Sequence, residues 1–358
     1  MLMTEKAEKF LYQYLNNASP TGFEAEGQKI WLEYIKPYID EWHLDNYGTL
    51  YAVINPGKDY RVVIEGHADE ISWFVNYIDD KGYISVIRNG GSDHLIAPSM
   101  RVNIHTAKGV VKGVFGWPAI HTRKGKDATL TPTLENIFID VGAKDKAEVA
   151  EMGIHVGCVV TFDEELTMIN NRYYAGRALD NRIGGFCIAE VARHIKEKGI
   201  DLPYTLYIVN SVQEEIGLRG AEMIAHTIKP HVAIVTDVCH DSSTPLVKAK
   251  EEGDVRCGNG PCLTIGPAVH NKLLQIIRDT AAEKNIPVQL AAASRSTGTD
   301  TDAFAYSNGG VPSALISLPL RYMHTTVEMA HKDDIQHVIQ LIFESLQKIE
   351  YGQSFKYF

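Results

Sequence analysis

The feature that most constrains the fold of this 358-residue chain is a change of pattern between about residues 75 and 165. On both sides of this stretch, apolar runs typical of buried strands alternate with helical patterns, which predicts an α/β sheet covered by helices. Inside it, short alternating segments are separated at close intervals by Gly, Pro, Asn and Asp, as in a small barrel or sandwich. We therefore expect an α/β domain over residues 1–75 and 165–358, interrupted by an inserted β domain over residues 76–164.

The α/β part is expected to begin with helices over residues 4–16 and 24–38, because apolar side chains recur there at helical spacing. The other expected helices cover residues 179–198, 221–226, 268–284, 302–307 and 332–351. The expected strands cover residues 49–55, 61–66, 204–212, 232–237, 288–290 and 313–318. The inserted domain is expected to contain strands at 83–87, 101–105, 109–115 and 159–162, and one short helix at 146–152 capped by Asp145.

The composition excludes several classes of partner. The chain has 35 Lys and Arg residues against 45 Asp and Glu residues, a net charge of −10 spread along its length. Such a chain lacks the basic surface of a nucleic-acid binder, and it is equally unsuited to an acidic membrane surface. We find no signal-peptide pattern and no run approaching the roughly 18 apolar residues of a membrane span. Five scattered cysteines indicate free thiols in a reducing compartment, so we expect a cytoplasmic protein.

Four of the predicted strands end in or near side chains that bind metal ions. In chain order these side chains are His67 and Asp69, Glu214 and Glu215, Asp237, and His324. Sites in open α/β sheets form beyond the carboxyl ends of the strands, so we expect these groups to converge. Imidazoles and carboxylates without paired cysteines favour Zn²⁺, with Co²⁺ and Mn²⁺ as alternatives. The groups are too many for one tetrahedral ion, so we expect two.

The individual positions suggest roles for the side chains. Asp180 stands at the start of the long helix expected over residues 179–198, where the helix dipole favours an anion, and is the candidate to bridge two ions. In His67-Ala68-Asp69, alternate residues share a face, so Asp69 could accept the second N–H of a metal-bound His67. Glu214 and Glu215 would repel each other if buried without cations, which favours one ligand and one proton acceptor. Each signal is weak alone; an adjacent Glu pair is commonly only a solvated turn.

Five segments, in order along nearly the whole chain, resemble the glutamyl and deblocking aminopeptidase family, which includes the tetrahedral aminopeptidases. They are His67-Ala-Asp-Glu-Ile, Ala178-Leu-Asp-Asn-Arg, Val212-Gln-Glu-Glu-Ile-Gly-Leu-Arg-Gly, Thr299-Asp-Thr-Asp-Ala and Arg321-Tyr-Met-His-Thr-Thr-Val-Glu-Met. The resemblance implies a phosphorylase/hydrolase-like three-layer α/β/α catalytic domain and an inserted barrel or PDZ-like domain that supports dimerisation. It also implies a homo-oligomer, either a dimer or a tetrahedral dodecamer.

The resemblance also implies the arrangement of the site. The ligands of one ion would be His67 and Asp237, and those of the other would be Glu215 and His324. Asp180 would bridge both ions, Glu214 would be the general base and Asp69 would support His67. The peptide bond after Asp180 would be cis. The chain departs from the family pattern at Ser72-Trp73 and Cys239-His240, and these departures bear on the shape of the substrate pocket.

We expect a co-catalytic two-metal aminopeptidase that removes N-terminal residues from short peptides with free N-termini. The chain has no Gly-x-Ser-x-Gly elbow of a serine hydrolase and no His-Glu-x-x-His helix of a zincin. The alternatives are hydrolysis of another amide, glycoside hydrolysis by two carboxylates, and a non-catalytic scaffold of the same fold. The preferred N-terminal residue is not determined; Arg219, Arg295 and Arg321 are candidates to bind an acidic one.

Overall fold

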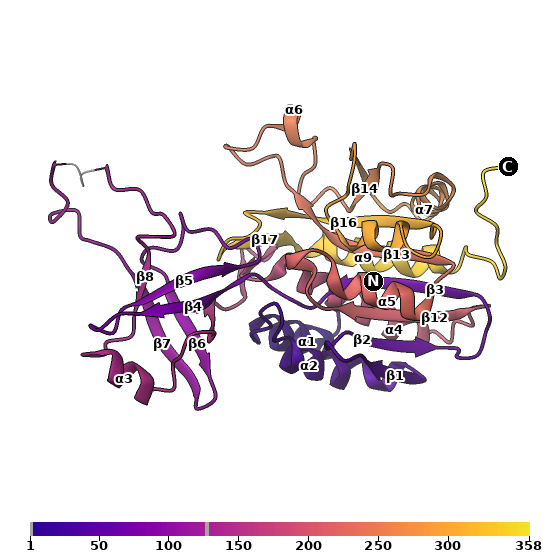
Figure 1. Cartoon of the computed structure of the whole chain (residues 1–358). Coiled ribbons are helices and arrows are strands. Elements are labelled where there is room, and N and C mark those ends of the chain that lie inside the picture. The colour runs from indigo at the N-terminus through magenta and orange to yellow at the C-terminus, as the bar shows by residue number, and fades with distance from the viewer. Residues whose placement is uncertain (1–2, 126–128) are drawn as a thin grey trace. The chain divides into compact units, whose positions relative to one another are not determined.

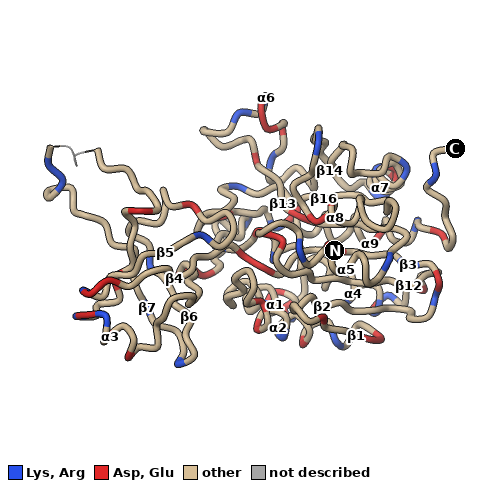
Figure 2. Tube along the Cα trace, in the orientation of Figure 1, with Lys and Arg blue, Asp and Glu red and all other residues tan. Residues whose placement is uncertain are grey.

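The computed structural model describes residues 3–125 and 129–358, which form two compact units (Figure 1). The first unit comprises the described residues up to Glu70, together with Leu166–Met323 and Val327–Phe358. The second comprises Ile71–Glu165 and His324–Thr326. Acidic and basic residues are interspersed along the trace of each unit (Figure 2). No helix of the described ranges is long and apolar enough to cross a membrane.

The first unit is built around a mixed sheet in which the described residues form 11 strands. Its central strands are, in spatial order, β12 (Thr205–Ser211), β3 (Arg61–His67), β13 (Val232–His240) and β16 (Ser313–Arg321). These four strands are parallel to one another and almost wholly buried, which explains why they read as continuous apolar runs. Their carboxyl ends therefore lie at one edge of the sheet, as the sequence predicted.

Shorter strands extend the sheet on both sides of this centre. They are β1 (Glu41–Leu44), β2 (Leu50–Ile54), β10 (Thr167–Ile169), β11 (Tyr173–Gly176), β14 (Cys262–Ile265), β15 (Gln289–Ala292) and β17 (Glu328–His331). β2 pairs antiparallel with β12, and β17 and β14 pair antiparallel with β16. Several of these strands have only three or four residues, too few for a clear alternation in the sequence.

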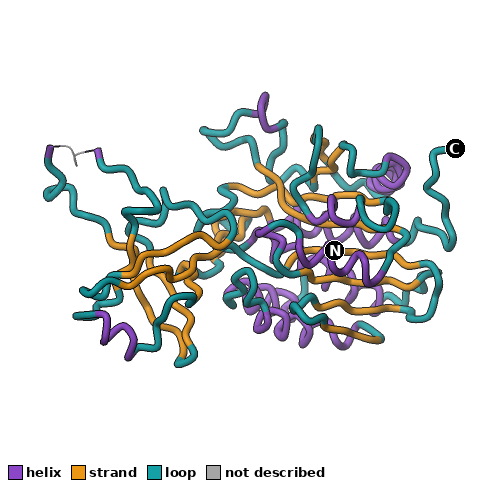
Figure 3. Tube along the Cα trace, viewed as in Figure 1, coloured by secondary structure: helices purple, strands orange, loops and turns teal. Residues whose placement is uncertain are grey.

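Helices pack on this sheet and make the first unit an α/β structure (Figure 3). They are α1 (Glu5–Asn16), α2 (Ala25–Ile35), α4 (Leu179–Glu197), α5 (Arg219–Ile228), α7 (Asn271–Glu283), α8 (Asp300–Ala305) and α9 (Lys332–Leu346). The short helix α6 (Ala249–Glu252) projects instead from the loop between β13 and β14 (Figure 1). Helix α4 packs against β3, and α1, α2 and α9 pack against α4, so α4 is buried on nearly all sides. Helices α5 and α8 pack against each other, and α8 also contacts β13 and β16.

The structure moves several of the expected boundaries: α2 ends at Ile35 and not at residue 38, and β16 continues to Arg321 and not only to residue 318. Two other corrections concern the core and the site. The closing helix α9 ends at Leu346 and not at residue 351, because the chain turns there and brings Ile349 into the core. Strand β13 continues to His240 and not only to Asp237, because β16 remains paired with it, His240 opposite Leu320. Asp237 therefore lies inside a strand and not at its end.

The second unit is a closed barrel with strand order β4-β5-β8-β7-β6-β9, which confirms the predicted all-β insertion (Figure 3). Its elements are β4 (Ser72–Ile78), β5 (Ile84–Asn89), β6 (Arg101–Thr106), β7 (Gly109–Gly116), β8 (Phe138–Asp140), α3 (Lys146–Glu151) and β9 (Val159–Phe162). Asp145 caps α3 as predicted, since its Oδ1 accepts a hydrogen bond from the Glu148 amide at 2.9 Å. Trp73 is fully buried in the barrel, where it packs edge-on against Phe115.

Candidate active site

The carboxyl edge of the central strands gathers three of the predicted ligands within the first unit. His67 is the last residue of β3, Asp237 lies in β13 and Asp180 lies in the first turn of α4. Nε2 of His67 lies 3.4 Å from Oδ1 of Asp180 and 3.9 Å from Oδ1 of Asp237. The three side chains are buried, and each offers a ligand atom within 4.8 Å of the others. One imidazole and two carboxylates thus share a space that fits a metal ion.

Asp180 reaches this edge because α4 passes very close to β3. A Cβ at Gly66 would lie 2.9 Å from the carbonyl carbon of Gly184, so any larger residue at position 66 would push the helix away. The side chain of Asn181 fastens the start of α4 to β13 by donating to the carbonyl of Thr236 at 2.8 Å. The peptide bond between Asp180 and Asn181 is cis, as the family resemblance implied.

Carboxylates surround the imidazole of His67. Burial by itself would lower the pKa of His67, but the neighbouring carboxylates, Glu214 first among them, raise that pKa well above its usual value. Nδ1 of His67 lies 3.3 Å from Oδ1 of Asp69, at an ion-pair distance but without the alignment of a hydrogen bond. Asp69 is therefore near enough to orient the ring, the role expected for it.

The carboxylate of Asp69 also accepts hydrogen bonds from the turn that carries Glu214 and Glu215, a contact that the sequence did not predict. Its Oδ1 accepts a hydrogen bond from the backbone amide of Glu214 at 3.0 Å, and its Oδ2 accepts one from the amide of Glu215 at 3.2 Å. These amides belong to the short 3₁₀ turn Glu214–Ile216 that follows β12, and the preceding Gln213 has a left-handed φ of 58°. One buried carboxylate therefore contacts the imidazole and the turn that carries both glutamates.

Glu214 points toward the same imidazole. Its Oε2 lies 3.7 Å from Nε2 of His67. Burial raises the pKa of Glu214 to about 10. The charge of His67 acts in the opposite direction, but repulsion from other carboxylates, including Asp237, offsets it. Glu215 offers an oxygen within 4.8 Å of a ligand atom of Asp180. Within the first unit, four of the five predicted ligands and the predicted base therefore lie near one another.

The fifth predicted ligand, His324, lies in the short segment His324–Thr326 of the second unit. It follows the end of β16 by three residues and has a left-handed φ of 62°. Within that unit its imidazole lies against the backbone of Gly91, where an added Cβ would be 2.4 Å from Nδ1 of His324. Glycine at position 91 therefore leaves the room that the ring occupies.

A second layer of carboxyl groups lies behind the site and was missed by the sequence analysis. The hydroxyl of Ser211 lies 2.5 Å from Oε1 of Glu65 and 2.7 Å from Oδ2 of Asp300. Burial, followed by mutual repulsion, raises the pKa of Glu65 well above its usual value, and burial also raises the pKa of Asp300. The available signal was a glutamate inside the apolar run of β3, since a buried acid requires a partner.

The donor set fits divalent metal ions. Burial and the charge of Asp180 raise the pKa of Asp237 well above its usual value, so these carboxylates crowd one another when no cation lies between them. Divalent cations among the carboxylates would offset both the burial and the repulsion. Imidazole and carboxylate ligands suit Zn²⁺, Co²⁺ and Mn²⁺ alike.

Comparison with known proteins identifies the family to which this chain belongs. Residues 48–341 match the model of the M42 glutamyl aminopeptidase family. The chain belongs to the M42 family. A lysyl aminopeptidase of Pyrococcus furiosus is 33% identical to this M42 member over 346 residues, which cover 96% of this chain and 97% of that protein.

Solved structures agree with this assignment. The crystal structure of a TET aminopeptidase from a marine-sediment Thaumarchaeota archaeon matches with a TM-score of 0.92 and 30% identity, covering 97% of this chain and 98% of that one. The TET1 peptidase of Pyrococcus horikoshii, which can assemble into a tetrahedron or a large octahedral shell, matches with a TM-score of 0.83 and 25% identity over 96% of this chain and 100% of that one. The predicted family and the predicted metal-dependent aminopeptidase function are confirmed.

Proposed function

We propose that this M42 aminopeptidase holds two divalent ions, Zn²⁺ in the first place and Co²⁺ or Mn²⁺ as alternatives, and removes N-terminal residues from short peptides with free N-termini. The observation that carries the proposal is the cluster of His67, Asp180 and Asp237, with Glu214 beside it. Such ions, when bound, lower the pKa of water and polarise a peptide carbonyl. No single tetrahedral ion would use all of the carboxylates at this edge.

The ligands divide into two sets around a shared carboxylate. His67 and Asp237 would hold one ion, and Asp180, which lies within 4.8 Å of groups in both sets, would bridge to the other. Glu215 and His324 would complete the second set. The support for His324 is its place in the chain, because β16 is the direct neighbour of β13 and ends only three residues before it.

Glu214 would act as the general base. Its Oε2 would take a proton from the attacking water and deliver it to the leaving amine, which contributes on the order of 10²–10⁴-fold to the rate. Cations next to Glu214 would lower its pKa from the raised value of about 10, so that the carboxylate form is present at neutral pH. Asp69 would hold the imidazole of His67 and the backbone of the turn in place.

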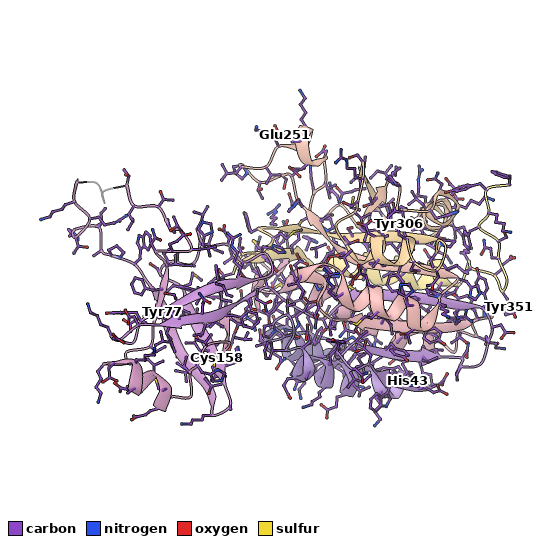
Figure 4. All side chains as sticks on the ribbon, in the orientation of Figure 1. His43, Tyr77, Cys158, Glu251, Tyr306 and Tyr351 are labelled. Atoms are coloured by element: carbon purple, nitrogen blue, oxygen red, sulfur yellow. The ribbon has the colours of Figure 1, made fainter. Side chains whose placement is uncertain are left out.

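We further propose a role for each unit. The first unit would be the catalytic domain, with the phosphorylase/hydrolase-like three-layer α/β/α arrangement, supported by the packing of α4 on β3 and of α8 on β13. The barrel domain, expected over residues 76–164, would support dimerisation, and it falls within the second compact unit, which comprises Ile71–Glu165 and His324–Thr326. It exposes apolar side chains such as Tyr77, which projects from β4 (Figure 4), together with Ile87, Val110 and Val114.

A homo-oligomer built on such dimers, up to a tetrahedral dodecamer, agrees with the assembly of the Pyrococcus horikoshii relative. A cytoplasmic location agrees with the five free cysteines. The specificity is open between the lysyl activity of one relative and the glutamyl name of the family. Arg321 pairs with Asp241 at 2.9 Å and Arg219 pairs with Glu222 at 3.1 Å, and Arg295 is the third candidate to bind an acidic residue.

The test is turnover on a panel of aminoacyl-p-nitroanilides, with N-acetylated substrates as controls, before and after chelation and metal add-back. We expect cleavage of free-amine substrates only, loss of cleavage on chelation, and recovery with Zn²⁺ or Co²⁺. Absence of cleavage in every metal state, with two ions bound by elemental analysis, would favour another amide substrate or a non-catalytic scaffold. Chelator-insensitive release of sugars from a glycoside would favour the two-carboxylate alternative.

A further inference from the structure

The segment that connects α1 to α2 is buried against the chain just after β3. Pro20 forms a parallel bridge with Glu70. The amide of Glu70 donates to the carbonyl of Ser19 at 3.0 Å, and the amide of Thr21 donates to the carbonyl of Glu70 at 3.1 Å. Both Ser19 and Thr21 are buried. This connection therefore acts as a short extra strand beside the residues that follow His67.

Thr21 brings its hydroxyl to the carboxylate of Asp69. Its Oγ1 lies 2.9 Å from Oδ2 of Asp69 and 3.1 Å from the carbonyl oxygen of Glu70. A hydroxyl has only one proton to donate. The bond to Asp69 is the shorter, and bonds to an ionised carboxylate are stronger than bonds to a carbonyl, so Asp69 is the preferred acceptor.

The orientation of the Asp69 carboxylate determines which groups each of its two oxygens contacts. Its Oδ1 faces the amide of Glu214 and Nδ1 of His67, whereas its Oδ2 faces the amide of Glu215 and the hydroxyl of Thr21. The terminal torsion of an aspartate has a broad energy profile, so the side chain does not fix this orientation by itself. Among the residues that the structure describes, two groups donate to Oδ2: the backbone amide of Glu215, which belongs to the turn after β12, and the hydroxyl of Thr21, which belongs to the α1–α2 connection. Thr21 therefore contacts Asp69 from a segment that carries neither the predicted ligands nor the predicted base.

The start of α2 holds the turn after β12 from its other side. Oε1 of Glu24 accepts hydrogen bonds from the amides of Gly22 at 2.7 Å and Gln213 at 3.3 Å. The amide group of Gln28 donates to the carbonyl of Asn210 at 2.8 Å. Residues 19–28 therefore contact both of the segments that carry the predicted catalytic groups.

We propose that Thr21 is a positioning residue for peptide hydrolysis. Its hydroxyl fixes the rotation of the Asp69 carboxylate, and through that carboxylate it holds the imidazole of His67 and the turn that carries Glu214. The inference rests on the proposed function and extends it to a residue that touches neither substrate nor ion. Partners of this kind around a metal ligand typically affect metal affinity or activity by 10–100-fold, and one step further out we expect about tenfold.

The experiment compares Thr21→Val, which keeps the shape but removes the hydroxyl, with Thr21→Ser, which keeps the hydroxyl. Thr49→Val is the matched control, because the hydroxyl of Thr49 is fully buried and has no hydrogen-bond partner among the described residues. For each protein kcat and KM on an aminoacyl-p-nitroanilide are measured, and the Zn²⁺ dissociation constant is measured by chelator competition without substrate.

For Thr21→Val we expect kcat to fall about tenfold with KM within twofold of wild type, and the Zn²⁺ dissociation constant to rise several-fold. Thr21→Ser should recover most of both losses, and Thr49→Val should resemble wild type. Wild-type kcat and Zn²⁺ affinity in Thr21→Val would overturn the inference, as would a loss that Thr21→Ser does not recover. Failure of the wild-type protein to cleave any free-amine substrate would instead refute the proposed function.

Discussion

Oε2 of Glu214 lies 3.7 Å from Nε2 of His67, although His67 ends β3 and Glu214 lies in the turn after β12. The contact exists because β12 and β3 are parallel neighbours and Ser211 is paired with His67. The turn that follows Ser211 then carries Glu214 over the edge of the sheet toward the imidazole. The predicted base thus lies beside the predicted ligand His67.

Glu214→Gln tests this separation of roles. The amide cannot take a proton from water, so we expect kcat to fall on the order of 10²–10⁴-fold while two zinc ions per chain are retained. Steady-state kinetics and elemental analysis of the same preparation are the measurements. Glu222→Gln is the control, since Glu222 is an exposed residue of α5 in an ion pair with Arg219 and should have wild-type kcat. Normal kcat in Glu214→Gln would exclude this role.

Glu24 predicts a pH dependence of stability. Burial, with a further contribution from Asp69, raises the pKa of Glu24 from 4.5 to about 8. The folded state then binds a proton that the unfolded state has released, so the free energy of unfolding should fall as the pH rises from about 4.5 to about 8. The loss is on the order of a few kcal/mol, since one pKa unit corresponds to about 1.4 kcal/mol.

Glu24→Gln removes this titration with little change in shape and should make the fall of the free energy of unfolding less steep in that pH range. Urea denaturation at several pH values measures it, with Glu26→Gln as the control because Glu26 is exposed on the same helix. A curve for Glu24→Gln with the same slope as wild type would show that Glu24 does not titrate in this range.

Gly91→Ala tests the placement of His324. A Cβ 2.4 Å from Nδ1 of His324 is closer than any real contact, so the ring must move. We expect zinc to fall from two ions per chain toward one, with kcat reduced at least tenfold, by elemental analysis and steady-state kinetics. The double variant with His324→Ala should lose no more than His324→Ala alone, because the effect passes through the ring. Additive losses would place the effect of Gly91 elsewhere.

The part of the candidate site that could be predicted from the sequence is the part that lies at strand ends. The apolar runs before His67 and Glu214 located two strands whose carboxyl ends share an edge, and parallel pairing made convergence a consequence. The position of Asp180 required only the start of a long helix. The positions of these residues could be predicted because each follows from a local sequence pattern together with one general rule of α/β sheets.

Contacts between distant segments could not be read in the same way. Ser211 joins Glu65 and Asp300 through one hydroxyl, although 89 positions separate Ser211 from Asp300. The link from Thr21 to Asp69 likewise depends on how the α1–α2 connection lies against β3. Such contacts are fixed by tertiary packing, and no period or motif in a single sequence encodes them.

Asp180 and Asp237 offer the sharpest test of the two-ion arrangement. A bridging carboxylate serves both ions, whereas Asp237 would serve one. Asp180→Ala should therefore hold less than one zinc per chain after dialysis, and Asp237→Ala should retain about one.

Both residues are buried in the same cluster, so each variant removes one buried carboxylate and the two variants control for each other. Circular dichroism of the metal-free proteins checks that each variant is folded. Zinc content is measured by elemental analysis after equilibration at a fixed free Zn²⁺ concentration. Equal zinc contents in the two folded variants would show that Asp180 does not bridge, because a ligand to one ion should cost no more than one ion.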